Sequence, residues 1–429
     1  MKKLTVFLLL FLGIAWPLAA VPRADLDLSL VPPVVNTRPG PEYQDEARRG
    51  AMIIGMDRTP RGRIWACWTG TGDNAESYFI LATSDDDGTT WSKPRVVIDP
   101  KDTPGKPPLR SLVGNLWCDP TGRLWLFFDQ SLGVFDGRAG DWFITCDNPD
   151  AAEPVWSQPV RFADGCTLNK PTVLKNGEWL LPVSLWHRQH IIPSLFKEEY
   201  HELDSQRMAH VYISTNQGKS WTRRGGVVIP KTDFDEHTIV ERRDGQLWML
   251  ARTLYGVAES FSSDAGRTWS EPQPSAIKNV SARMFIRSLA SGRLLLVKNG
   301  PTDQRLPGRS HMSAFLSDDD GKTFAKKIEG LSSPKLQGFA GGFGGGGDAD
   351  GESGLWAGEM EVDGGGSSAL SRLKPPAPAR MLPAGSEAAS MAEVAEILLK
   401  MQSDLHLSSP SAGTRGGGGA THGSQPLWI

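Results

Sequence analysis

Carboxylate and guanidinium side chains stand at the ends of several predicted strands in this 429-residue chain. Asp73 follows one apolar strand, Glu236 precedes another, Arg252 ends a third, and Arg309 comes shortly before a fourth. Arginine binds a carboxylate in bidentate fashion through its planar fork, and a positioned carboxylate can transfer protons. The four residues could therefore bind an anion and perform acid–base chemistry, although each could also be an ordinary turn or surface residue.

Other reactive residue types give weaker signals. His187 ends a strand and could carry a proton, or it could simply hydrogen-bond within a loop. Asn169 and Lys170 begin a strand and could bind a ligand, although Lys-Pro is an ordinary strand entry. The sequence has no His-Glu-x-x-His, phosphate loop or Gly-x-Ser-x-Gly motif, and its four cysteines have no metal-ligand spacing. We therefore expect no metal and no cofactor, with cysteines that are buried free thiols or include one disulfide.

An internal repeat predicts the elements that must position these residues. The pattern Ser-x-Asp-x-Gly-x-Thr-Trp occurs four times with small variations, starting at Ser84, Ser214, Ser262 and Ser317. Its Asp or Asn can bond to the backbone two residues on, and its Gly can take a positive φ, as hairpin turns require. A degenerate fifth copy fits between Thr145 and Ser157, with extra residues in the turn.

A second repeat predicts the fold. Glycine turns precede five apolar strands that begin at Ile64, Leu124, Trp179, Leu247 and Leu294. One turn and one hairpin in every 50–65 residues or so is typical of a four-stranded propeller blade. We predict an all-β, six-bladed propeller over residues 21–335, with five recognisable blades and a last blade that is incomplete or built from the N-terminal strand. The longer insertion at residues 188–207 is expected to form a short helix or a lid.

Charge and the chain termini indicate where the protein acts. Acidic residues number 49 and basic residues 46, without a basic stripe, so we expect no nucleic-acid partner. Residues 1–20 have the charged start, apolar run and small-residue end of a signal peptide, although an uncleaved anchor is the alternative. We expect a secreted or periplasmic protein with no membrane span after signal removal.

The composition changes after about residue 335. Residues 336–429 are rich in Gly, Ala, Ser and Pro, and only residues 391–405 have helical periodicity. We expect a mostly disordered tail with one short helix. Either a shifted reading frame or a genuine linker with a helical tail would explain the change.

The repeated hairpins resemble the Asp-box repeats of the sialidase (neuraminidase) superfamily over about residues 35–330. The resemblance implies a six-bladed propeller that removes terminal sialic acid, or a related acidic sugar, from glycans. It implies that Asp73 is the catalytic acid/base and that Glu236 polarises the nucleophile. It also implies that Arg252 and Arg309 hold the substrate carboxylate. The Asp-box itself occurs in non-enzymatic propellers too, on turns away from the active face.

Two positions depart from the family pattern. Met52 stands where the family has its first arginine, and Arg49 lies just upstream as a substitute out of register. The family's tyrosine nucleophile belongs to the last blade, and no tyrosine follows Tyr255 here. We therefore expect weak or absent turnover from this chain.

Two function hypotheses remain open. The first is an exported, monomeric glycoside hydrolase of sialidase type with a glycan or glycoconjugate substrate. The second is a non-catalytic propeller that binds glycans or proteins. Convergence of the four site residues on one central cleft would favour the enzyme.

Overall fold

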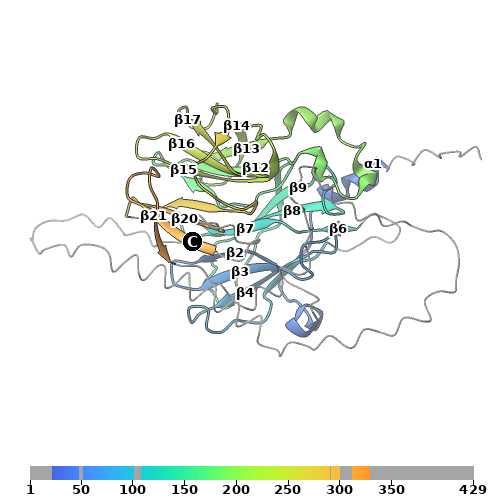
Figure 1. Cartoon of the computed structure of the whole chain (residues 1–429). Coiled ribbons are helices and arrows are strands. Elements are labelled where there is room, and N and C mark those ends of the chain that lie inside the picture. The colour runs from blue at the N-terminus through green and yellow to red at the C-terminus, as the bar shows by residue number, and fades with distance from the viewer. Residues whose placement is uncertain (1–21, 48–51, 101–107, 290, 300–311, 329–429) are drawn as a thin grey trace, which may run out of the picture.

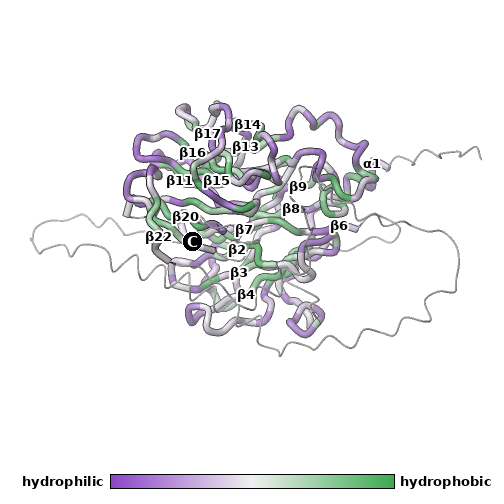
Figure 2. Tube along the Cα trace, in the orientation of Figure 1, coloured by the Kyte–Doolittle hydropathy of each residue, from purple (hydrophilic) through white to green (hydrophobic). Residues whose placement is uncertain are grey.

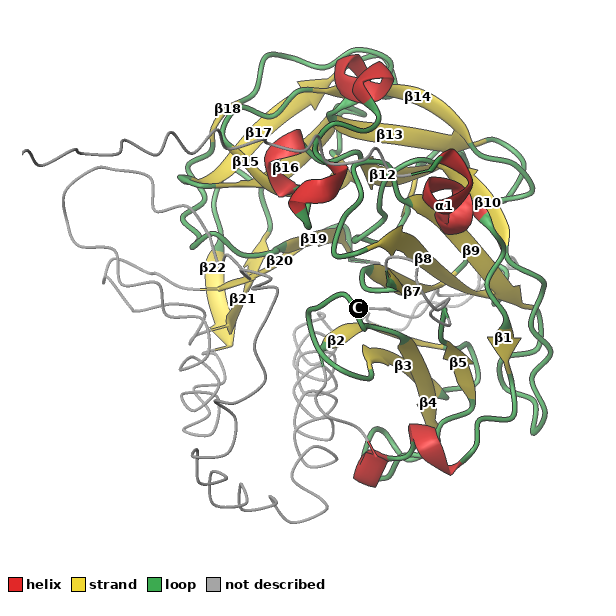
Figure 3. Cartoon of the chain, turned by 90° about the vertical axis from the view of Figure 1, so that its right-hand side faces the viewer, coloured by secondary structure: helices red, strands yellow, loops and turns green. Residues whose placement is uncertain are grey.

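The computed structural model describes residues 22–47, 52–100, 108–289, 291–299 and 312–328. Its strands form five antiparallel sheets around a common axis, which Figure 3 shows end on. The predicted all-β propeller is therefore confirmed. Five predictions lie outside the described residues: the signal peptide, Arg49, Arg309, the C-terminal tail and the end of a sixth blade.

The first two blades contain five strands each (Figure 1). Blade one is β1 (Val35–Asn36), β2 (Ile53–Arg58), β3 (Ile64–Thr69), β4 (Phe79–Ser84) and β5 (Val96–Ile98). Blade two is β6 (Leu109–Arg110), β7 (Gly114–Cys118), β8 (Leu124–Leu132), β9 (Gly140–Cys146) and β10 (Val160–Ala163). The N-terminal strand β1 pairs with β5 at the outer edge of blade one. The alternative in which it builds a sixth blade is therefore wrong for the described chain.

The other three blades have four strands each. Blade three is β11 (Thr172–Val173), β12 (Trp179–Ser184), β13 (Ala209–Ser214) and β14 (Thr222–Val227). Blade four is β15 (Thr232–Glu241), β16 (Leu247–Thr253), β17 (Gly256–Ser262) and β18 (Gln273–Pro274). Blade five is β19 (Phe285–Ser288), β20 (Leu294–Asn299), β21 (Met312–Ser317) and β22 (Ala325–Ile328).

Helices are few and short. They are α1 (Arg23–Leu26) and the 3-10 helices η1 (Asp27–Leu30), η2 (Pro41–Tyr43), η3 (Asp45–Ala47), η4 (Arg188–His190), η5 (Ser194–Phe196) and η6 (His201–Gln206). The last three form the insertion between β12 and β13, where the sequence predicts a short helix or a lid. Phe196 and Tyr200 of the insertion pack with Leu26 of α1 in one buried cluster.

In every blade a glycine turn links two consecutive strands: β2 and β3, β7 and β8, β11 and β12, β15 and β16, and β19 and β20. In each turn the glycine N–H donates to the carbonyl three residues before it, and its φ is positive, from 77° to 102°. An L-residue other than glycine rarely adopts this conformation. The glycines are Gly62, Gly122, Gly177, Gly245 and Gly292.

The repeated hairpins link β4 to β5 in blade one, β13 to β14 in blade three, β17 to β18 in blade four and β21 to β22 in blade five. In each one the serine hydroxyl accepts a hydrogen bond from the glycine N–H at 2.7–2.9 Å and donates to the Asp or Asn two residues on. The degenerate copy occupies the same place in blade two, where Cys146 replaces the serine and contacts Asn148. These turns lie at the same end of each blade as the glycine turns, because the strands alternate in direction.

Removing one hairpin serine should destabilise the protein. Ser262 is buried, and its hydroxyl serves both the Gly266 N–H and the Asp264 carboxylate. A buried donor left without a partner costs about 1–3 kcal/mol, so Ser262→Ala should lower the free energy of unfolding by that amount. Urea denaturation measures the effect, and Ser263→Ala at the exposed neighbouring position is the control. An equal response of the two variants would contradict the role of the hydroxyl.

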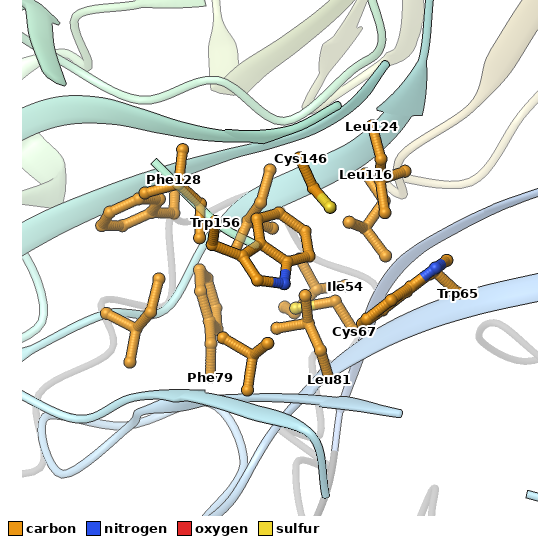
Figure 4. Packing of buried hydrophobic residues seen from close by; sticks show 14 of the residues in the cluster. Ile54, Trp65, Cys67, Phe79, Leu81, Leu116, Leu124, Phe128, Cys146 and Trp156 are labelled. Carbon is orange, nitrogen blue, oxygen red and sulfur yellow. The ribbon is translucent and has the colours of Figure 1, made fainter. Parts of the chain in front are cut away.

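Hydrophobic residues are concentrated in the strands (Figure 2), and their side chains pack between neighbouring blades. Figure 4 shows the interface of blades one and two, where Trp65 and Phe79 face Leu116, Phe128 and Trp156. The Trp65 indole donates to the Pro149 carbonyl at 3.1 Å and meets the Trp156 ring edge-on at 5.4 Å. Burying such large rings stabilises the fold by more than 1.5 kcal/mol each, which fixes adjacent blades and thereby the strand ends that carry the site.

The cysteines are buried free thiols, which is the first of the two predicted alternatives. All four are buried and free, and burial raises the pKa of the Cys67 and Cys166 thiols well above the ordinary value. They are therefore core residues rather than nucleophiles.

Candidate active site

Asp73, Glu236 and Arg252, the predicted site residues that the structure describes, lie at one end of the propeller, which we call the mouth. At the mouth the strands β2, β7, β11, β15 and β19 begin, and the loops that follow β3, β8, β12 and β16 lie there too. Asp73 lies on the β3–β4 loop, Glu236 in the first half of β15, and Arg252 near the end of β16. The repeated hairpins lie at the opposite end.

Glu236 and Arg252 form an ion pair. Glu236 Oε2 lies 3.1 Å from Arg252 Nη1, and both side chains are largely buried. Asp233 Oδ2 lies 2.7 Å from Arg252 Nη2, and the Ser281 hydroxyl is 3.1 Å from Arg252 Nε. All three guanidinium nitrogens therefore have partners, and the two carboxylates outweigh the single positive charge of Arg252.

The backbone that presents Glu236 has an uncommon conformation. Phe234, Asp235 and Glu236 have φ of 67°, 56° and 43°, and the pairing of β15 with β16 shifts register on both sides of Asp235. Each residue other than glycine in this region costs about 1–2 kcal/mol. Such strain persists where the surroundings impose it, and it is concentrated at functional sites.

The insertion between β12 and β13 supports this strained segment. The His190 ring stacks on Phe234 at 3.9 Å and accepts a hydrogen bond from the Phe234 N–H. Trp186 contacts the same ring at 4.9 Å, and Gln189 donates to the Thr232 carbonyl. Burial lowers the pKa of His190 to about 4, so its imidazole is neutral at neutral pH and accepts this bond. The insertion thus holds the backbone of residues 232–234 in place, and this segment leads directly to Glu236.

Asp235 should make stability depend on pH. Its carboxyl is buried, which raises its pKa from 3.8 to about 7, while the Thr232 hydroxyl bond opposes the shift. Between these pH values the unfolded chain ionises Asp235 and the folded chain retains the proton, so this group's contribution to stability falls as pH rises. Asp235→Asn should therefore gain stability over the wild type by up to about 1.4 kcal/mol per pH unit across this range.

Paired denaturation curves of the wild type and Asp235→Asn at pH 4.5, 5.5 and 6.5 measure this difference. The difference isolates Asp235 because the neutral histidines affect both proteins equally. Asp244→Asn, at an exposed turn of the opposite end, is the matched control. A difference that is constant with pH would contradict the buried, protonated carboxyl.

Asp73 is exposed and accessible. Asn74 accepts hydrogen bonds from the Thr71 hydroxyl and the Glu76 N–H, and Ser77 donates to the Gly72 carbonyl. These bonds order the loop without using the Asp73 carboxylate, which has no hydrogen bond to any residue that the structure describes. An ordered loop with an accessible carboxylate suits proton transfer to a bound ligand.

A cavity of about 220 Å³ opens at the axis beside Glu236. Asn169, in its wall, donates from its side chain to the Glu236 carbonyl at 2.9 Å. Arg283, also in the wall, lies within electrostatic range of the Glu236 carboxylate. The lining comes from β2, β7, β19 and β20 and from the residues that precede β11 and β19: Ile53, Ile54, Gly55, Met56, Asn115, Asn169, Lys170, Arg283, Met284, Phe285, Val297, Lys298 and Asn299.

The lining combines apolar walls with polar groups. Lys170 donates to the Met56 carbonyl at 2.7 Å and pairs with Asp57 at 3.1 Å, and burial lowers its pKa to about 8. The Asn115 side-chain oxygen is buried without a hydrogen-bond partner among the described residues. Such a cavity suits a sugar, whose ring has apolar faces and whose substituents are polar.

The structure thus brings Glu236 and Arg252 into contact and places Asp73 at the same end of the molecule. Asn169 and Lys170 line the cavity, as the sequence suggested they could. His187 caps the short helix η4 by accepting from the Gln189 N–H, which accords with a loop histidine. Tyr255 is exposed on the β16–β17 turn, two residues beyond the end of Arg252-bearing β16.

Sequence reasoning missed Arg283 and the acid Asp233. Arg283 precedes β19 just as Glu236 lies near the start of β15, so comparing the first strands of the repeats could have found it. The spacing of residues in the sequence does not indicate Asp233, because its contact with Arg252 depends on the bulge in β15.

The described residues contain no group of three or more His, Cys, Asp and Glu side chains arranged to hold a metal ion. Within the same part of the chain, no helix has the length and apolar character needed to cross a bilayer.

The chain belongs to the family of BNR repeat-like domains, whose model matches residues 60–337. No curated protein sequence gives a match. Among solved structures, the Hadza microbial sialidase Hz136 aligns with a TM-score of 0.52 and 17% identity, over 67% of this chain and 60% of that sialidase. The propeller is therefore of the type found in sialidases.

Two further solved structures align over similar lengths. The intramolecular trans-sialidase from Ruminococcus gnavus, in complex with oseltamivir carboxylate, has a TM-score of 0.47 and 13% identity over 67% of this chain and 85% of its own. A protein of unknown function from Dyadobacter fermentans has a TM-score of 0.48 and 16% identity, over 70% of this chain and 86% of that protein. This chain spans less than two thirds of the length of the Hadza sialidase.

Proposed function

We propose that the protein is a glycoside hydrolase of sialidase type that acts on terminal sialic acid, or a related acidic sugar, of glycans. The observation that carries the proposal is the Glu236–Arg252 ion pair beside the axial cavity, at the end of a sialidase-type propeller that also bears Asp73. Most enzymes that hydrolyse a glycosidic bond use two carboxylates that flank this bond.

In this proposal the carboxylates have different tasks. Asp73, exposed on its loop, protonates the leaving oxygen as the glycosidic bond breaks. Glu236 accepts a proton from the water that attacks the anomeric carbon, and Arg252 and the strained β15 segment fix the orientation of Glu236. Turnover should be slow, because no tyrosine follows Tyr255 to serve as the nucleophile that the family resemblance implies.

A non-catalytic glycan-binding propeller is the second candidate. The observation that favours it is the engagement of Arg252 by Asp233 and Glu236, which leaves this arginine ill placed to hold a substrate carboxylate. A protein with that arrangement could bind glycans at the mouth without cleaving them.

We also propose that the protein is exported and acts as a monomer. The support for export is the leader-like sequence of residues 1–20. Fractionation of the expressing cells tests the location, and light scattering tests the oligomeric state.

Release of free sialic acid from sialyllactose tests the proposed activity. We expect slow release by the full chain, and Asp73→Ala should slow this release by a further factor of about 10²–10⁴. Binding of sialyllactose without any release, at any enzyme concentration, would favour the non-catalytic candidate. Neither binding nor release would contradict both.

A further inference from the structure

We infer that the N-terminal segment of residues 22–31 is a positioning element of the site, and that Leu26 is its central positioning residue. The segment orders the insertion between β12 and β13, which in turn holds the backbone that presents Glu236. The inference rests on the proposed function for its catalytic consequence. It gives a role to a segment outside the blades that neither the repeats nor the family resemblance indicates.

Buried polar side chains fix this segment to blade two. The Gln130 amide, on β8, donates to three backbone carbonyls of the segment at 2.8–3.3 Å. The Arg138 guanidinium, on the β8–β9 loop, donates to the Leu26 carbonyl at 2.8 Å. Both donor side chains are buried, where hydrogen bonds are strong and an unpaired donor is costly. The segment is therefore held in one place on the propeller.

The Leu26 side chain covers the insertion. Leu26 is 2% exposed and shares one buried cluster with Phe196 and Tyr200 of the insertion, and Figure 1 shows α1 beside this part of the chain. The Tyr200 hydroxyl also donates to the Leu26 carbonyl at 3.4 Å. The three 3-10 helices of the insertion have three to six residues, and helices this short need packing to be stable. The order of the insertion thus depends on Leu26.

Arg207 connects Tyr200 to the part of the insertion that contacts the site. Its guanidinium donates to the Tyr200 carbonyl at 3.4 Å and to the Trp186 carbonyl at 3.0 Å. The Trp186 ring lies 4.9 Å from the Phe234 ring, and Phe234 packs against the same buried cluster. A continuous series of contacts therefore joins α1 to the backbone that presents Glu236.

The strain in β15 makes this support important. Residues 234–236 all have positive φ, a conformation that persists only while its surroundings impose it. Weaker packing behind Phe234 would let these residues relax, and the Glu236 carboxylate would leave its present place 3.1 Å from Arg252. Misplacing a catalytic group slows the chemical step more than it weakens substrate binding.

Hydrogen exchange of full-length Leu26→Ala tests the inference without relying on activity. The Asp235 N–H donates to the Thr232 hydroxyl, so it exchanges when this part of β15 opens. Exchange of residues 232–236 is expressed relative to exchange of β20 in blade five, which corrects for a general loss of stability. We expect Leu26→Ala to raise this ratio by about tenfold or more.

Three further variants serve as controls. Leu124→Ala removes the same buried side chain from the core at the opposite end of blade two and should leave the ratio unchanged. Leu26→Met retains the buried volume and should behave as the wild type. Leu26→Val is a smaller truncation that should raise the ratio in the same direction, and it provides an answer if Leu26→Ala fails to fold.

A ratio that stays at the wild-type value in the Leu26 truncations, or an equal rise in Leu124→Ala, would overturn the inference. Turnover of sialyllactose is measured separately, and Leu26→Ala should lower kcat by about tenfold or more with little change in KM. The expected exchange in a protein whose wild type shows no turnover would contradict the proposed function alone. An active wild type whose kcat survives Leu26→Ala would contradict this inference alone.

Discussion

Replacing Asp73 with alanine should slow the cleavage of sialyllactose by about 10²–10⁴-fold while leaving the affinity for the sugar unchanged. Asp73 is exposed on an ordered loop at the mouth, and its carboxylate supports no other described residue, so its loss should not disturb the fold. The effect should fall on kcat rather than on binding, since a general acid acts on the leaving oxygen in the transition state.

The leaving group provides a sharper version of this test. Nitrophenol departs without protonation, so Asp73→Ala should affect the nitrophenyl sialoside far less than sialyllactose. Glu76→Ala removes an exposed carboxylate from the same loop and should behave as the wild type with both substrates. Equal losses with the two substrates would contradict the role of Asp73 as the general acid.

Arg252→Met should cost about 3–5 kcal/mol of stability, as expected when one partner is removed from a buried charge cluster. The substitution leaves Asp233 and Glu236 largely buried without the guanidinium that pairs with both. Chemical denaturation measures the loss of stability. The affinity for the acidic sugar should also fall, because the residues of the mouth become less ordered.

A combined variant separates the charge effect from the loss of packing. Adding Asp233→Asn and Glu236→Gln to Arg252→Met removes the two uncompensated charges and should restore most of the stability. Persistence of the full loss in the triple variant would show that Arg252 contributes through packing, for instance against the Phe234 ring at 5.5 Å, and not through its ion pairs.

The repeats made most of the fold predictable from the sequence. Each glycine turn requires a positive φ and each hairpin serine satisfies a glycine N–H locally, so the same short sequence gives the same turn in every blade. The N-terminal strand was harder to place. Its pairing with β5 depends on a contact between residues about 60 apart, which no local pattern records.

The site was predictable where the sequence matches the family pattern and not where the backbone departs from the repeat. The roles of Glu236 and Arg252 came from the family resemblance, and the structure puts the two residues in contact. Asp233 reaches Arg252 only because β15 bulges through residues 234–236. The contact of His190 with Phe234 also joins distant segments, and burial is the largest cause of the lowered pKa of that histidine.

A crystal structure of the protein with N-acetylneuraminic acid bound tests the central claim most directly, because it locates the sugar and its charged group together. The account predicts the sugar in the axial cavity at the mouth, with its anomeric carbon facing Glu236. A sugar bound away from the mouth would contradict it.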